Sequence, residues 1–318
     1  MLLVQKFGGS SLADLECLRR SAEIVLRARR EGHRLVVVVS AAGDSTDELI
    51  DMAHAIDPAP PLREMDALVS TGEQRSAALM AIQLGRLGVP ARSFSGWQAG
   101  IQTDAAHGGA RILRIDPTRL EQALDAGLVA VVAGFQGVTG EGDVSTLTRG
   151  GSDTTAVALA ARLGADRCEI YTDVDGIFTA DPRLIPEARK LTQIDSRDML
   201  ALALAGSQVL HPDSVRIAME QGVELHLLSS FRPGAGTRVA YLPEKERPAL
   251  AGVTREAAKA SVTLAGRGAD AALLPAVLEA LKARGILVRR SEIAENALTL
   301  SLAPEQVDDA MKTLHGFL

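Results

Sequence analysis

Cysteine and long apolar runs are scarce in this sequence. Only two cysteines occur among 318 residues, Cys17 and Cys168, and both stand beside apolar residues. We therefore expect buried free thiols and a reducing cytoplasm, and neither a disulfide framework nor a CxxC metal site. The apolar runs at residues 35–39 and 128–133 have the length of strands, so we expect no transmembrane span. The first residues lead into a glycine-rich turn, which does not look like a cleavage site.

The sequence also lacks an excess of positive charge. Lysine and arginine number 34 against 40 aspartates and glutamates, which gives a net charge of -6 and argues against a nucleic acid or a membrane as partner. The six histidines show no metal-ligand spacing, and His211, before a proline, is expected to be structural. With 47% hydrophobic residues the chain can bury a full core, and its length predicts one large and one small domain.

A glycine-rich turn with a lysine follows the first predicted strand. It occupies residues 6–11 (KFGGSS). Gly8 and Gly9 have no Cβ, so their N–H groups can approach an anion closely, and we expect a helix starting near Leu12 to point its positive end there. Lys6 adds a point charge for phosphate. Because the lysine precedes the glycines, this is not a Walker motif, and a tight strand-to-helix connection is the alternative.

A second glycine pair opens an alanine-rich helix at residues 148–166 (TRGGSDTTAVALAARLGAD). Ser152 or Asp153 is expected to cap this helix, so a well-capped helix is one explanation of the segment. That explanation leaves Arg149 unaccounted for. An arginine before two glycines and beside a helix N-terminus can bind a carboxylate in bidentate fashion.

A third segment, residues 168–183 (CEIYTDVDGIFTADPR), predicts a buried strand at 168–171 and then an acidic loop. The charged residues of the loop are Asp173, Asp175, Asp181 and Arg183. Asp-Gly and Asp-Pro turns explain some of the acids, but a phosphoryl-transfer site also needs acids for Mg²⁺ and polar groups for a nucleotide.

Strand-like runs alternate with helical patterns over most of the chain. The strands are expected at residues 35–40, 91–94, 129–134, 168–171 and 224–228, with helices such as 12–30 and 76–87 between them. This alternation predicts an α/β fold with a mostly parallel sheet and crossover helices. Ligands of such sheets lie at the carboxyl ends of the strands, where Lys6, Ser40, Gly134 and Thr172 fall.

The C-terminal part predicts a separate small α+β unit. Residues 241–248 (YLPEKERP) are interpreted as a linker. Strands are then expected at 260–264, 286–290 and 297–302, and helices at 271–284 and 304–314. Residues 250–254 could supply a fourth strand. We therefore predict domains at residues 1–243 and 249–318.

Together these segments resemble the aspartate kinases of the amino-acid kinase family. The resemblance covers roughly residues 1–240, in family order. It rests on KFGGSS, VVVVSAAGDSTDELI (36–50), LVSTGEQRSAALMA (68–81), SGWQAGI (95–101), VAGFQGV (132–138), TRGGSDTTAVALAA (148–161), YTDVDGIFTADPR (171–183) and VLHPDSV (209–215). It implies a mostly parallel sheet sandwiched by helices, which agrees with the alternation above.

The activity implied by the resemblance is ATP-dependent phosphorylation of the side-chain carboxylate of L-aspartate. The product would be 4-phospho-L-aspartate, the first intermediate of lysine, threonine and methionine synthesis. ATP is the expected cosubstrate, and Mg²⁺ would be held mainly by its phosphates and by water, without a dedicated protein metal site. Two alternatives stay open: a kinase of the same family acting on another small carboxylate or amino acid, and a catalytically weak member that serves as a regulatory subunit.

The resemblance also implies roles for individual residues. The catalytic pair would be Lys6, facing the transferred phosphoryl group with the Gly8 and Gly9 amides, and Asp153, orienting Lys6. Ser40, Thr46 and Ser152 would bind aspartate, together with Glu73 at its α-ammonium and Arg149 at its α-carboxylate. The nucleotide site would comprise Lys6, Gly8, Gly9, Ser10, Thr172, Asp173, Phe178, Asp181, Arg183 and Gln208.

The sequence departs from the family pattern in three places. Phe178 stands where a tyrosine is usual, and Gln208 where a lysine commonly contacts the nucleotide phosphates. The C-terminal unit resembles one ACT-type module where the family usually has two, and its turn at residues 266–275 departs from the usual Asp-x-x-Gly form. A regulatory domain and a dimerisation domain are equally compatible with it, and we expect a homodimer or a larger homo-oligomer.

Overall fold

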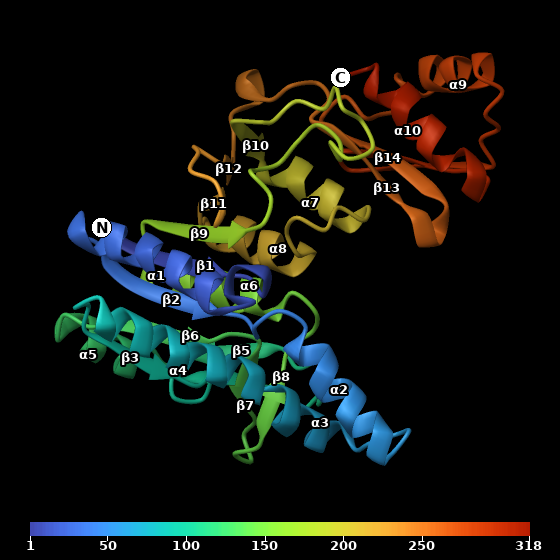
Figure 1. Ribbon diagram of the computed structural model, residues 1–318. Coiled ribbons are helices and arrows are strands. Elements are labelled where there is room, and N and C mark those ends of the chain that lie inside the picture. Colours follow the sequence, from blue (N-terminus) through green and yellow to red (C-terminus); the bar gives the residue numbers. More distant parts are fainter. The chain divides into compact units, whose positions relative to one another are not determined.

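The structure, a computed structural model, describes all 318 residues (Figure 1). The chain divides into two compact units. The first comprises Met1–Asp175 and Gln221–Gly234, and the second comprises Gly176–Glu220 and Ala235–Leu318. The chain thus leaves the first unit and returns to it once. The domain boundary expected after residue 243 stays a prediction from the sequence pattern.

Six parallel strands form the centre of the first unit. Their order is β11-β9-β1-β2-β6-β3, and every pair in this series is parallel. The strands are β1 (Leu2–Phe7), β2 (Arg34–Val39), β3 (Ala91–Phe94), β6 (Val129–Ala133), β9 (Arg167–Thr172) and β11 (Leu225–Ser229). All five residues of β6 are buried, as expected of a strand covered on both faces. The mostly parallel sheet predicted from the sequence is therefore confirmed.

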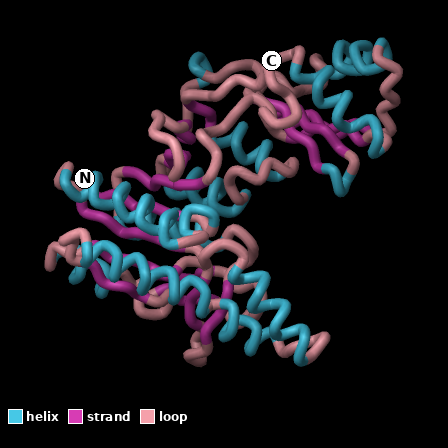
Figure 2. The backbone as a smooth tube through the Cα atoms, in the orientation of Figure 1, coloured by secondary structure: helices cyan, strands magenta, loops and turns pink.

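Helices cover both faces of this sheet (Figure 2). They are α1 (Leu15–Arg30), α4 (Thr71–Arg86), α5 (Thr118–Asp125) and α6 (Gly151–Leu163), and the short 3-10 turn η1 (Ser10–Leu12) precedes α1. Helices α2 (Ser45–Ile56) and α3 (Leu62–Val69) pack against each other, and α3 also packs against β8 (Val144–Thr146). Buried side chains of α1 and α4 pack on one face, against residues such as Leu3, Phe7 and Val37. Helix α6 packs against β1, β2 and β9. These helices leave the carboxyl ends of the strands free for loops.

A second, small sheet lies in the first unit and has no counterpart in the sequence prediction. Its order is β5-β4-β7-β8, with β4 (Ile101–Thr103), β5 (Ile112–Ile115), β7 (Gln136–Val138) and β8 (Val144–Thr146). Strand β7 follows β6 directly, and β8 leads into α6. These strands of three or four residues are too short to show a readable alternation of apolar and polar residues.

The second unit contains a parallel strand pair and an antiparallel sheet. The pair is β10 (Gln193–Asp195) and β12 (Thr237–Ala240), accompanied by α7 (Ser196–Leu204) and α8 (Pro212–Gln221). The sheet has the order β13-β14-β16-β15, with β13 (Gly252–Glu256), β14 (Ser261–Ala265), β15 (Arg290–Ala294) and β16 (Ala297–Ser301). Buried residues of α9 (Leu274–Ala283) and α10 (Val307–His315) pack on it. The turns η2 (Glu244–Glu246), η3 (Ala257–Lys259) and η4 (Pro304–Gln306) complete the unit.

The small α+β unit expected at the C-terminal end is thus confirmed, with one correction. The segment expected to complete its sheet does so, since β13 pairs with β14 at the edge. The strand expected at residues 286–290 lies instead at Arg290–Ala294. Ile286 is buried in the core of the unit, as part of the connection before the strand. All five residues of β15 are exposed, so the strand has no apolar side for a sequence pattern to reveal.

The segment interpreted as a linker, residues 241–248, connects β12 to β13 and is ordered against its surroundings. The segment contains a 3-10 turn, and the side chain of Arg247 is only 2% exposed. Its Nη2 lies 2.5 Å from Asp198 Oδ1 and donates to Asn296 Oδ1 at 2.7 Å. This arginine therefore fastens the segment to α7 and to the turn between β15 and β16.

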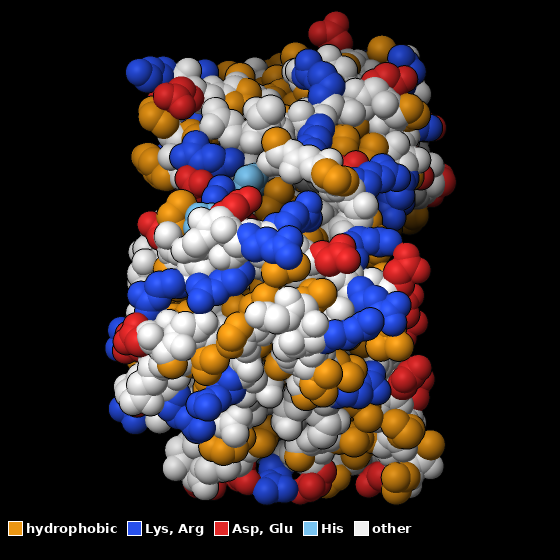
Figure 3. Space-filling model, turned by 60° about the vertical axis from the view of Figure 1, so that its left-hand side comes forward, with side chains coloured by type: hydrophobic (Ala, Val, Ile, Leu, Met, Phe, Trp, Pro, Cys, Tyr) orange, Lys and Arg blue, Asp and Glu red, His pale blue; other side chains and the backbone are white.

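The surface charge is mixed. In the face shown in Figure 3, lysines and arginines are interspersed with carboxylates and apolar side chains. None of the helices combines the length and the apolar character that a membrane crossing requires.

Candidate active site

The glycine-rich turn lies at the carboxyl end of β1 and packs closely on its neighbours. The Gly8 N–H donates to the Tyr171 carbonyl at 3.2 Å, at the end of β9. A Cβ on Gly9 would lie 3.0 Å from the Ala41 carbonyl oxygen, in the loop that follows β2. A larger residue at this position would therefore push the turn away from that loop. The N–H groups of Gly9 and Ser10 have no partner, so they are the free backbone donors of the turn.

Lys6 and Asp153 form an ion pair beside this turn. Lys6 Nζ lies 2.6 Å from Asp153 Oδ1, and each side chain is 12% exposed. The prediction that Ser152 or Asp153 caps α6 was wrong. Gly150 is the N-cap, with φ at 75°, a left-handed conformation that glycine adopts without strain. The helix therefore starts earlier, and Asp153 lies in its first turn, where its carboxylate is available to Lys6.

The helix that begins beside Lys6 is α6, and not the one expected at Leu12. Helix α1 starts at Leu15, after η1, and its first turn is capped by Asp14, which accepts from the Cys17 N–H at 2.8 Å. The expectation that the N-terminus of α1 points at the glycine turn was therefore wrong. The positive N-terminal end of α6 takes that place.

Glu73 is a buried carboxyl group with one unpaired oxygen. It lies in the first turn of α4 and is 3% exposed. Oε1 accepts from the Ala41 N–H at 3.1 Å, while Oε2 is buried without a hydrogen-bond partner. Burial raises the pKa of Glu73 to about 7. A buried acceptor of this kind is suited to a charged donor that arrives with a ligand.

The loop after β2 is fastened to both β1 and α4. The Ser40 N–H donates to the Phe7 carbonyl at 3.1 Å, which places Ser40 at the end of β1. Arg75 Nη2, on α4, donates to Ser45 Oγ at 2.5 Å. The half-buried Thr46 follows Ser45 in the first turn of α2. Sequence reasoning did not single out Arg75, although it lies in one of the segments that carry the resemblance.

Arg149 and Ser152 differ in their surroundings. Arg149 is exposed and makes no hydrogen bond or ion pair within the chain. Ser152 is 7% exposed and packs against Gly134, because a Cβ on Gly134 would lie 2.8 Å from Ser152 Oγ. The free guanidinium of Arg149 is the feature that can bind an external carboxylate.

The residues expected to bind the nucleotide fall in both units. In the first unit, Thr172 Oγ1, on the last residue of β9, donates to Asp173 Oδ1 at 2.9 Å. The first unit also contains the residues of the glycine turn, and the second unit contains Phe178, Asp181, Arg183 and Gln208. Arg183 Nη2 lies 2.8 Å from Asp181 Oδ2. Phe178 is half-buried, and Gln208 is exposed in the connection between α7 and α8.

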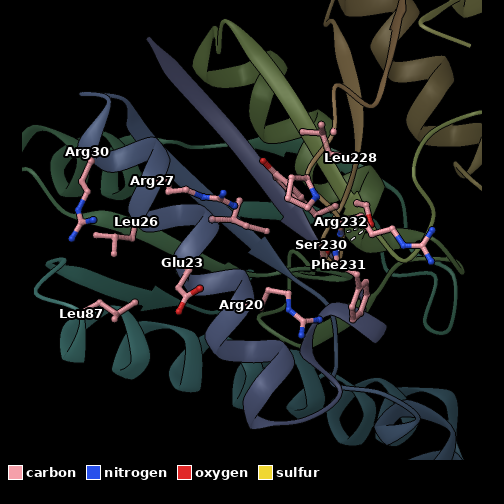
Figure 4. A pocket seen from close by; sticks show the side chains of 15 residues that line it. Arg20, Glu23, Leu26, Arg27, Arg30, Leu87, Leu228, Ser230, Phe231 and Arg232 are labelled. Carbon is pink, nitrogen blue, oxygen red and sulfur yellow. Dashed lines mark hydrogen bonds between the residues drawn. The ribbon is translucent and has the colours of Figure 1, made fainter.

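The first unit also has a groove that the sequence did not predict. It has a volume of about 620 Å³ and lies between α1 and the loop that follows β11. In Figure 4, Arg20, Arg27 and Arg30 project from α1, and Phe231 and Arg232 come from the loop. Ser230 Oγ in this loop lies 2.6 Å from Ser11 Oγ, so the groove borders the glycine turn.

Comparison with known proteins places this geometry in a family. Residues 1–229 match the amino acid kinase family. The chain is 50% identical over 287 residues to an aspartokinase of Thermus thermophilus, which covers 90% of this chain and 71% of that protein. The structure of an aspartate kinase from Synechocystis is 32% identical, with a TM-score of 0.70 over 100% of this chain and 69% of that one.

A third relative is E. coli aspartokinase III, whose structure was determined in complex with aspartate and ADP. It is 28% identical, with a TM-score of 0.73 over 95% of this chain and 78% of that one. The chain therefore belongs to the amino acid kinase family and, within it, to the aspartokinases.

Proposed function

We propose that the chain transfers a phosphoryl group from ATP to the side-chain carboxylate of L-aspartate, the first step of aspartate-family amino-acid synthesis. The observation that carries this proposal is the buried Lys6–Asp153 pair beside free backbone donors at the carboxyl ends of parallel strands. The 50% identical relative is named an aspartokinase, and aspartate and ADP are the ligands of the E. coli structure.

Lys6 and the glycine turn form the phosphoryl side of the proposed site. Asp153 occupies one side of the Lys6 ammonium, and the other N–H donors of that group can face the phosphoryl oxygens. The N–H groups of Gly9 and Ser10 add donors of fixed direction. Gly8 contributes by having no side chain there, because its own N–H is engaged by Tyr171. Charge that develops on the transferred group is thus met by donors already in place.

Glu73 and Arg149 form the recognition side. The unpaired Glu73 oxygen would accept from the α-ammonium of aspartate, and the free Arg149 guanidinium would pair with the α-carboxylate. Opposite charges at the two ends select an amino acid over a plain dicarboxylate. Ser40, Thr46 and Ser152 complete the proposed aspartate site near its reacting end.

Mg²⁺ would enter with the nucleotide. The chain has no group of three or more histidine, cysteine or carboxylate side chains placed to hold a metal ion. Near the turn, Asp153 is engaged by Lys6, and Asp173 is exposed. This donor set fits an ion held mostly by phosphates and water, which would neutralise phosphate charge during transfer. Thr172, Asp173, Phe178, Asp181, Arg183 and Gln208 are the proposed nucleotide contacts.

Self-association is part of the proposal. Strand β15 is a fully exposed edge of the antiparallel sheet in the second unit. An open edge of this kind can pair with the same edge of a second copy, so we propose a homodimer or a larger assembly.

A coupled assay for ADP release tests the proposed activity. L-aspartate should support turnover with Mg·ATP, while L-glutamate, L-asparagine and succinate should not. Turnover with another acceptor in the absence of turnover with aspartate would contradict the assignment.

A further inference from the structure

A buried carboxylate outside the glycine turn gathers donors from two distant segments. Asp66, on α3, is 1% exposed. Its Oδ2 lies 2.7 Å from His107 Nδ1, and its Oδ1 accepts from the Gly108 N–H at 3.1 Å. Thr146 Oγ1, at the end of β8, donates to the same Oδ1 in a short hydrogen bond. The carboxylate thus joins α3, the loop between β4 and β5, and β8.

Asp66 is connected to Glu73 through the helices α3 and α4. A single residue, Ser70, separates α3 from α4, and its backbone is itself helical, with φ at -60° and ψ at -19°. The Ser70 N–H donates to the Asp66 carbonyl at 3.1 Å. The Ser70 carbonyl accepts from Gln136 Nε2 at 2.9 Å. The path from Asp66 to Glu73 is therefore short and mostly helical, so a shift of α3 is transmitted to α4.

Asp66 is connected to Arg149 through Thr146. Thr146 is the last residue of β8, and Arg149 follows three residues later. The backbone around Thr146 is held on both sides, because Ala110 donates to its carbonyl at 2.9 Å and Leu147 donates to Phe135 at 2.9 Å. The Arg149 side chain has no hydrogen-bond or ion-pair partner in the chain, so the position of the guanidinium depends on the position of the Arg149 backbone.

We infer that Asp66 is a positioning residue that sets the separation of Glu73 and Arg149. This inference rests on the proposed function, in which those two side chains bind the opposite charged ends of the amino-acid substrate. Asp66 touches neither substrate nor nucleotide in this account. Asp66 lies on α3, the helix before α4 and Glu73, and its carboxylate is hydrogen-bonded to Thr146 at the end of β8, three residues before Arg149. It therefore fixes the positions of α3 and β8 relative to each other.

The chemistry of the cluster suits such a role. A buried carboxylate that accepts several hydrogen bonds holds its donors in fixed directions, and charge-assisted bonds of this kind are stronger than neutral ones. A second link between α3 and the β7–β8 hairpin, the ion pair of Arg63 with Asp143 at 2.7 Å, lies at the surface, with side chains 52% and 31% exposed. Exposed pairs contribute little, so the buried link should dominate.

The decisive variant is Thr146→Val, which keeps the shape of the side chain and removes only the donor to Asp66. Thr139→Val is the matched control, because Thr139 is also buried, and its hydroxyl bonds only locally, accepting from the Asp143 N–H at 3.2 Å. Both full-length variants are compared with wild type by steady-state kinetics and by hydrogen exchange of peptides covering residues 144–151. Exchange needs no substrate, so it is informative even if aspartate is not the acceptor.

Thr146→Val should raise the KM for aspartate about tenfold, as expected for loss of one hydrogen bond to a charged group. Its KM for ATP should change less than about twofold, and exchange at residues 147–151 should be faster than in wild type. Thr139→Val should leave all three quantities near wild type.

Three results would overturn the inference: unchanged exchange at residues 147–151 in Thr146→Val, equal effects of the two variants on the KM for aspartate, or an equal rise of both KM values. If wild type does not use aspartate, the proposed function fails, and the exchange comparison alone decides whether Thr146 and Asp66 hold the segment before Arg149.

Discussion

Lys6 Nζ lies 2.6 Å from Asp153 Oδ1, although β1 and α6 are separated by more than a hundred residues of sequence. The ion pair gives the lysine a fixed position at the carboxyl end of β1. A flexible ammonium would otherwise have to be ordered during each turnover. Loss of Lys6 should therefore affect both catalysis and stability, and a second substitution at Asp153 separates the two effects.

Lys6→Met should lower kcat by about 10²–10³, the usual effect of removing one donor that stabilises transition-state charge. It should also destabilise the fold, because Asp153 would then be a mostly buried carboxylate without its partner. Steady-state kinetics and urea unfolding measure the two effects.

The double variant Lys6→Met/Asp153→Asn is the control. It should recover unfolding stability, since no unpaired charge remains, while kcat stays low. Recovery of kcat in the double variant would show that Lys6 matters only for structure.

Glu73→Gln should change the free energy of unfolding by an amount that depends on pH. Burial raises the pKa of Glu73 from 4.5 to about 7, so the folded state binds more protons than the unfolded state between these values. The stability contribution of Glu73 is therefore complete below about pH 4.5 and is lost as the pH rises through about 7. A glutamine has no such loss, so at pH 8 the variant should be more stable than wild type by up to about 3 kcal/mol.

The same variant should bind aspartate poorly at every pH, because glutamine offers no charge to the α-ammonium. In wild type, kcat/KM for aspartate should fall as the pH drops below about 7, where Glu73 becomes protonated. A stability difference that does not grow between pH 5 and pH 8 would contradict the assigned burial of the charge.

Arg149→Ala should raise the KM for aspartate about 10- to 100-fold and the KM for ATP much less, because the α-carboxylate loses a charge-assisted partner. Arg149 is exposed, so the effect should be smaller than for a fully buried ion pair, and the fold should keep its stability. Arg149→Lys keeps the positive charge but cannot form a bidentate pair, so its KM for aspartate should lie between those of wild type and Arg149→Ala. Equal changes in both KM values would refute the role.

Gln208→Lys should change kcat by less than about threefold. The exposed Gln208 stands where related kinases commonly have a lysine, yet Lys6, Asp153, Glu73 and Arg149 all remain. We therefore expect that other cations already supply the charge. A rise of kcat by about 10²–10³ in this variant, from a wild-type rate near background, would show a weakened kinase instead.

The sequence predicted the large elements of the fold because their signals are local. Strands β2 and β6 are continuous apolar runs, and β3 was predicted at its observed bounds. The start of α6 was missed because the left-handed φ of Gly150 moves the cap two residues earlier than the side chains suggest. Strand β15 was misplaced because none of its residues is buried.

In the candidate site, too, some features could be predicted from the sequence and others could not. The charges of Lys6, Glu73 and Arg149 could be recognised from segments that resemble a known family. The partnership of Asp66 with His107 and Thr146 could not, because it joins positions 41 and 80 residues apart through hydrogen bonds that no periodicity records. The unpaired oxygen of Glu73 is likewise visible only once α4 lies against the loop after β2.

The central claim is that the side-chain carboxylate of aspartate receives the phosphoryl group. The most direct measurement incubates the protein with Mg·ATP, L-aspartate and hydroxylamine, and identifies the trapped hydroxamate by mass spectrometry. The account predicts the β-hydroxamate of aspartate, formed in step with ADP and at a rate about 10²–10³ times lower with Lys6→Met. An α-hydroxamate, or ADP release without any hydroxamate, would contradict it.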